Sequence, residues 1–200
     1  MQPLVPNVLD WTRFSEPHGY DFHGTLLELE DGNVCIDPVE PSATDLEELA
    51  ERGVARIVLT NRNHVRAANR IRAVTGARTV MHAADAEHAR RQGAVLDGEI
   101  AQGARIGPLT IVSVAGKSPG EVAIHWAERR LLVVGDAVIG NPPGRLSLLP
   151  EAKLDDPRSL RASVRRLVDL DLDVLVVGDG VPILAGARAA LERLAAGFPD

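Results

Sequence analysis

The sequence predicts a mixed α/β fold, of α+β type, and two observations carry this prediction. Three apolar runs each end abruptly in a polar residue and a turn; they are Val54–Thr60, Leu131–Val134 and Val174–Val177. Short runs rich in β-branched residues and closed by turn residues are typical of buried strands. Strands alternate with helical patterns near both ends of the chain, and consecutive strands lie between. This order favours a mixed α/β sandwich.

The first half is expected to open with a hairpin. Residues 24–30 and 33–37 flank Asp31-Gly32, a dipeptide typical of hairpin turns. A helix then runs to Arg52 with Ser42 or Thr44 as its cap, because these residues favour helix N-termini. The remaining predicted elements are a strand ending at Thr60, a helix from about His64 to Thr75 ended by Gly76, a strand over 78–82 and a short helix over 84–92 ended by Gly93.

The second half is expected to contain three consecutive strands followed by a helix, a strand and a final helix. The strands cover 109–114, 121–127 and 130–134, and the helix runs from Pro157 to Leu170 with Asp155 or Asp156 near its cap. The last strand covers 173–177, and the final helix runs from about Ile183 to Ala195. No linker or low-complexity segment divides the chain, so a single domain over residues 1–200 is predicted.

The composition excludes several classes of partner. A net charge of −6 and an aromatic content of 3% argue against nucleic-acid binding, which uses a basic face and stacking platforms. No apolar run approaches the roughly 18 residues of a membrane span. The one cysteine, Cys35, lies in the run Val34–Ile36 and is expected to be a buried hydrophobe. We expect a cytoplasmic, bacterial protein of undetermined oligomeric state.

Polar residues that follow the predicted strands form the candidate site. The chain contains two nearly identical segments, LLVVGDAV around Asp136 and VLVVGDGV around Asp179. Functional groups tend to lie on loops supported by such strands. We therefore expect a pocket lined by Asn61, Asn63, His64, Asp136 and Asp179, and its chemistry depends on whether these residues bind a metal.

The order of these features resembles the metallo-β-lactamase superfamily. The family signature Thr-His-x-His-x-Asp-His corresponds to residues 60–66, and its His-x-Pro-Gly segment corresponds to Lys117-Ser118-Pro119-Gly120. Gly135-Asp136 matches the segment of the bridging aspartate, and Gly178-Asp179-Gly180 matches a Gly-His-Gly turn. The resemblance implies a four-layer αββα sandwich with metals bound by strand-end loops along one edge.

The family's metal ligands are mostly absent. Of the expected ligand positions only Asp136 keeps its residue type. Asn61, Asn63 and Lys117 replace the histidines of the first metal site, and Val65, Arg66 and Asp179 replace the ligands of the second. Zinc prefers imidazole, thiolate or carboxylate ligands. The usual dizinc centre, and any metal cofactor, is therefore not expected.

A charge argument suggests what replaced the metals. An unpaired buried carboxylate is costly, so Asp136 and Asp179 need positive partners. We expect Arg66 and Lys117 to supply these charges, in a network completed by Asn61 and Asn63. Taken singly, each residue could instead be a surface charge or a turn cap, and Asn61 could cap the helix opening near His64.

Two functions remain after this comparison. The favoured one is a divergent metallo-β-lactamase-fold protein with a degenerate metal site, binding a small anionic ligand through Arg66 and Lys117. The alternative is a hydrolase with a remodelled centre, in which one divalent ion (Zn, Mn or Fe) binds Asp136, Asp179 and His64. No Gly-x-Ser-x-Gly elbow and no phosphate-binding loop is present, so no catalytic residue is assigned.

Overall fold

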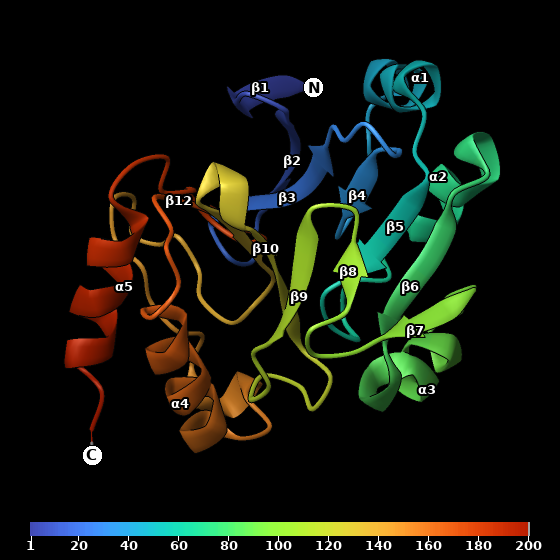
Figure 1. Ribbon diagram of the computed structural model, residues 1–200. Helices are drawn as coiled ribbons and strands as arrows, with labels where there is room; N and C mark the ends of the chain where they lie inside the picture. The colour runs from blue at the N-terminus through green and yellow to red at the C-terminus, as the bar shows by residue number, and fades with distance from the viewer. Residues whose placement is uncertain (200) are drawn as a thin grey trace. The chain divides into compact units, whose positions relative to one another are not determined.

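The structure, a computed structural model, describes residues 1–199 (Figure 1). The chain divides into two compact units, Met1–Ile100 and the part that begins at Ala101. Each unit has its own sheet and its own hydrophobic core. A single domain over the whole chain stays a prediction.

The first unit contains a seven-stranded sheet in the order β1-β2-β3-β4-β5-β6-β7. The strands are β1 (Gln2–Val5), β2 (Val8–Ser15), β3 (Tyr20–Leu27), β4 (Val34–Ile36), β5 (Arg56–Leu59), β6 (Arg78–His82) and β7 (Gly98–Ile100). Strands β1 to β4 pair antiparallel, and β4 to β7 pair parallel. The carboxyl ends of β4 and β5 therefore meet at one edge of the sheet, which brings the residues after these strands together.

The predicted hairpin of β3 and β4 is correct, but its turn is longer than expected. Leu27 pairs with Val34, so six residues, 28–33, connect the strands. The Asn33 side chain stabilises this loop by accepting a hydrogen bond of 3.1 Å from the Leu29 backbone. Strands β1 and β2 were not predicted, although Leu9 and Trp11 alternate with Asp10 and Thr12 in β2.

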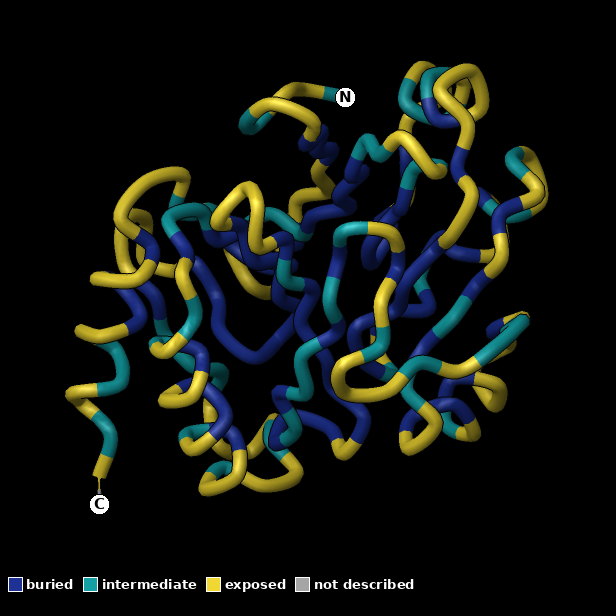
Figure 2. The backbone as a smooth tube through the Cα atoms, in the orientation of Figure 1, coloured by how far each residue is buried: buried dark blue, intermediate teal, exposed yellow. Residues whose placement is uncertain are grey.

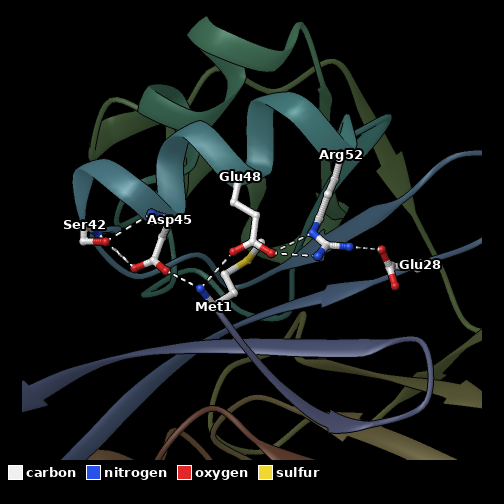
Figure 3. Close-up of polar contacts among 6 residues, drawn as sticks. All are labelled: Met1, Glu28, Ser42, Asp45, Glu48 and Arg52. Atoms are coloured by element: carbon white, nitrogen blue, oxygen red, sulfur yellow. Dashed lines mark hydrogen bonds and ion pairs between the residues drawn. The ribbon is translucent and has the colours of Figure 1, made fainter.

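The first helix confirms its predicted cap. Helix α1 (Ala43–Arg52) begins after Ser42, whose hydroxyl accepts from the Asp45 backbone at 3.1 Å, while Asp45 accepts from the Ser42 backbone at 3.3 Å (Figure 3). The Met1 amino group lies 2.6 Å from Asp45 Oδ1 and 3.0 Å from Glu48 Oε2 (Figure 3). These contacts attach the start of the sheet to α1.

The second helix is shorter than predicted. Helix α2 (Ala68–Thr75) begins four residues after His64, and it has no side-chain cap. The segment before it forms turns, in which the Ala67 backbone N–H donates to the Pro38 carbonyl at 3.1 Å. Asn61 therefore does not cap this helix, and that interpretation was wrong. Gly76 ends α2 in the left-handed conformation, as predicted. Helix α3 (Ala83–Arg91) follows β6 with His82 as its cap.

The second unit contains a five-stranded sheet in the order β12-β11-β10-β9-β8. The strands are β8 (Arg105–Ile106), β9 (Leu109–Ser113), β10 (Val122–Trp126), β11 (Leu131–Val134) and β12 (Val174–Val177). Only β11 and β12 pair parallel, with Val134 opposite Val177, and the other described pairs are antiparallel. The two matching Val-Val-Gly-Asp segments therefore end at the same edge of this sheet.

Helices α4 (Pro157–Leu167) and α5 (Ala187–Ala196) belong to the second unit, with short 3-10 turns η1 (Ala127–Arg129) and η2 (Glu151–Lys153). Asp156 caps α4 as predicted, by accepting from the Ser159 backbone at 2.9 Å. Helix α5 begins later than predicted, because Ile183 exchanges backbone hydrogen bonds with Leu175. A residue paired in this way is not available for a helix.

The strands of both units are buried along much of their length (Figure 2). Cys35 has no exposed surface, and burial raises the pKa of its thiol, which confirms it as a buried hydrophobe. Among residues 1–199, no helix has the length and apolar character needed to cross a membrane.

Candidate functional site

In the first unit, the loops after β4 and β5 form a buried hydrogen-bonded cluster. Thr60 donates from its backbone N–H to Asp37 Oδ1 at 2.8 Å and from its hydroxyl to Asp37 Oδ2. His64 Nδ1 lies 2.8 Å from Asp37 Oδ2 and 3.1 Å from Thr60 Oγ1. Because an ionised carboxylate only accepts hydrogen bonds, we assign the proton to Nδ1. This nitrogen is therefore committed to Asp37 and is not a metal-binding atom.

The other predicted residues of this loop have different environments. Asn61 is buried, and its Oδ1 accepts from the Asn63 backbone N–H at 2.9 Å, which forms an Asx turn. Asn63 itself is exposed. The Arg66 guanidinium lies over the Phe22 ring, 4.8 Å from its centroid. Val65 packs in the apolar core of this unit.

In the second unit, Lys117 and Asp136 form a buried ion pair. Lys117 Nζ lies 2.7 Å from Asp136 Oδ2, and the two side chains are only 9% and 7% exposed. Asp136 follows β11, and its backbone N–H donates to Glu121 Oε1 at 2.8 Å. Glu121 has no exposed surface. This geometry brings together two of the residues that the sequence predicts in one charge network, Lys117 and Asp136.

The loop that carries Lys117 is fixed by the start of α4. The Gly116 carbonyl accepts from the Asp156 backbone at 2.8 Å, and the Lys117 carbonyl accepts from the Asp155 backbone at 3.3 Å. Gly116 has φ +146°, and a Cβ atom there would lie 2.3 Å from the Leu160 nitrogen. Only glycine fits this position. The backbone of Lys117 is thus held in place by contacts on both sides.

Asp179 occupies the position after β12 that corresponds to Asp136 after β11. It is 5% exposed, and its carbonyl accepts from the Gly140 backbone at 2.9 Å. Gly140 and Gly180 lie against each other, and a Cβ atom on Gly140 would lie 1.9 Å from the Val181 carbonyl oxygen. This close backbone contact fixes the turn that carries Asp179.

Two carboxylates of these clusters were not predicted as site residues. Asp37 and Glu121 are both buried, and both accept hydrogen bonds from backbone N–H groups of strand-end loops. Their only sequence signal is an acidic residue directly beside an apolar strand, in Ile36-Asp37-Pro38 and in Gly120-Glu121-Val122. Among residues 1–199, no three His, Cys, Asp or Glu side chains form a group that could hold a metal ion.

Comparison with known proteins identifies the family. A sequence profile described as the metallo-β-lactamase superfamily matches residues 2–198. The chain belongs to the metallo-β-lactamase superfamily. Its fold agrees: a metallo-β-lactamase from Pontibacter korlensis superposes with a TM-score of 0.80 at 18% identity, covering 98% of each chain. The metallo-β-lactamase FIM-1 from Pseudomonas aeruginosa, solved in a mono-zinc form, gives a TM-score of 0.77 at 16% identity, over 98% of this chain and 95% of that one.

One relative has a more specific name. The hydroxyacylglutathione hydrolase of Cereibacter sphaeroides is 31% identical over 167 residues, which cover 80% of this chain and 62% of the relative. This superfamily member therefore spans about three fifths of the length of that relative. The predicted metallo-β-lactamase fold is confirmed by these likenesses.

Proposed function

We propose that this chain is a metallo-β-lactamase-fold protein in which the Lys117 ammonium takes the place of a metal, so that it is not a dizinc hydrolase. The observation that carries the proposal is the buried 2.7 Å contact between Lys117 Nζ and Asp136 Oδ2. The family resemblance places Lys117 at the position of a histidine ligand and Asp136 at the position of the bridging aspartate. A cation of the protein itself therefore neutralises the one carboxylate that keeps its family type.

Electrostatics argue against Lys117 and a metal sharing Asp136. A zinc ion on Oδ2 would lie about 2 Å from that oxygen, and the ammonium lies 2.7 Å from it, so the two cations would be roughly 4 to 5 Å apart. Two unit charges at that distance repel by about 4 kcal/mol at an effective dielectric constant of about 20, so a dication and an ammonium repel by about 8 kcal/mol. Binding a metal would require Lys117 to leave Asp136 or to lose its proton.

Apart from the Asp179 carboxylate, the other side chains at the family's ligand positions do not fit a dinuclear zinc centre either. The Asn61 amide oxygen, a poor zinc ligand, accepts from the Asn63 backbone. His64 occupies a variable position of the family signature and not a ligand position, and its Nδ1 is committed to Asp37. Val65 offers no donor atom. We therefore assign no hydrolytic step to a metal in this protein.

Binding of a small anion is the second part of the proposal, and it depends on the same lysine. The Lys117 ammonium is a positively charged hydrogen-bond donor, which suits a phosphate or carboxylate. Isothermal titration with inorganic phosphate and with acetate tests this part. Saturable binding that is lost in Lys117→Met and kept in Lys153→Met supports it, whereas equal binding by both variants places the anion elsewhere.

The proposal against dizinc hydrolysis is tested by a turnover assay. A hydroxyacylglutathione thioester is the first substrate to test, because of the relative's name, and zinc, manganese and iron are added in turn. We expect no metal-stimulated turnover. Turnover that depends on a metal and is abolished by Asp136→Ala would instead favour the remodelled hydrolase.

A gain-of-function variant gives an independent test. Lys117→His restores the histidine of the family pattern beside Asp136, within the second unit. If Lys117 replaces a metal, this variant should bind zinc more tightly than the wild-type chain. Equal zinc binding by the two proteins would contradict the proposal.

A further inference from the structure

The second unit contains a groove that the proposed function does not use. It has a cavity volume of about 650 Å³ and lies between the loop 144–148 and helix α5. Leu146 and Ala190 in its lining are buried, and Leu148, Leu194 and Phe198 are half-buried. The groove therefore offers a largely apolar floor, in the size range of small-molecule sites.

Two arginines line this groove from different elements. Arg145 comes from the loop and Arg193 from α5, and both are exposed. Within the described part of the chain, neither guanidinium takes part in a hydrogen bond or an ion pair. By contrast, Arg188 on the same helix pairs with Glu192 at 3.2 Å. None of the lining residues that the structure describes is acidic.

We propose that this groove binds an amphipathic monocarboxylate, that is, a free acyl chain of medium length with a carboxylate head. A guanidinium matches a carboxylate through two parallel hydrogen bonds, so Arg145 and Arg193 suit an anionic head. The apolar floor suits the chain, because covering apolar surface removes it from water. Neither Lys117 nor Asp136 lines this groove, so this inference is independent of the Lys117 proposal.

Isothermal titration with three probes tests the class of ligand. Dodecanoate, kept below its micellar concentration, has both the head and the chain; acetate has only the head; dodecyltrimethylammonium has the same chain with the opposite charge. We expect saturable binding of one dodecanoate per chain that an excess of acetate does not displace, and at least about tenfold weaker binding of the cationic amphiphile. Equal affinity for the two amphiphiles, or no binding of dodecanoate, would overturn the proposal.

Variants locate the site. Arg145→Gln and Arg193→Gln should each weaken dodecanoate binding by about threefold to fivefold, as for an exposed ion pair. The matched control is Arg188→Gln, which removes the same charge from α5 outside the groove and should leave the affinity unchanged. All three changes lie at exposed positions, and circular dichroism checks that each variant folds.

Two further readouts distinguish binding in this groove from binding elsewhere on the protein or to a membrane. Amide chemical-shift changes on adding dodecanoate should concentrate in residues 144–148 and 190–198. If the protein instead binds phosphatidylglycerol vesicles but no monomeric dodecanoate, the groove faces a membrane and the proposal is wrong. Shift changes confined to other parts of the chain would also overturn it.

Discussion

Replacing Lys117 by methionine should destabilise the protein substantially. The change keeps most of the side-chain volume and removes the charge that lies 2.7 Å from Asp136. Both partners are less than a tenth exposed, so water cannot replace the lost ammonium. The backbone of Asp136 also donates to Glu121 Oε1, which keeps a second carboxylate nearby. Removing one partner of such a pair typically costs about 3–5 kcal/mol.

Urea unfolding followed by circular dichroism measures this loss in the free energy of unfolding. Lys153→Met is the matched control, because Lys153 is exposed and is the other lysine of the chain; it should change the free energy by less than about 1 kcal/mol. The double variant Lys117→Met/Asp136→Leu should recover much of the loss, since it leaves no uncompensated charge. Equal midpoints for Lys117→Met and Lys153→Met would refute the reasoning.

Other predictions test the acid stability and the backbone packing. The backbone N–H of Thr79, together with Arg72, lowers the pKa of Asp97. A carboxyl whose pKa is lowered on folding contributes stability above the pKa it has in the unfolded chain, about 4, and this contribution is lost as the pH falls below that value. Asp97→Asn removes the contribution, so the free energy of unfolding of the variant should fall less steeply as the pH is lowered. An unchanged pH dependence would contradict the assignment. Gly140→Ala should lower the free energy of unfolding by about 1–3 kcal/mol, because the new Cβ would lie 1.9 Å from a backbone carbonyl oxygen. Gly98→Ala, where the nearest atom lies at 3.6 Å, is the control and should cost less.

The sequence predicted most of the strands and helices where the local signals agree. The repeated Val-Val-Gly-Asp segments marked β11 and β12 correctly, because a short β-branched run and a turn favour the same structure. Ser42 and Gly76 marked the start and end of helices for the same reason. The predicted start of α2 was wrong, because the Asn61 side chain forms an Asx turn that competes with the helix.

The candidate site was predictable only in part. Lys117 and Asp136 could be assigned to one cluster in advance, because both fall at positions of one family pattern. Asp37 and Glu121 could not, since an acidic residue beside a strand is usually solvated and only the tertiary structure buries these two. The commitment of His64 Nδ1 to Asp37 likewise depends on the parallel pairing of β4 and β5, which local sequence does not specify.

The metal content of the purified protein tests the central claim most directly. The chain is produced with zinc, manganese and iron in the medium, purified without chelators, and measured by inductively coupled plasma mass spectrometry alongside a zinc titration. If Lys117 takes the place of the metal beside Asp136, metal should be well below one ion per chain and the titration should show no tight site. One or two tightly bound ions per chain, released on Asp136→Ala, would contradict the account.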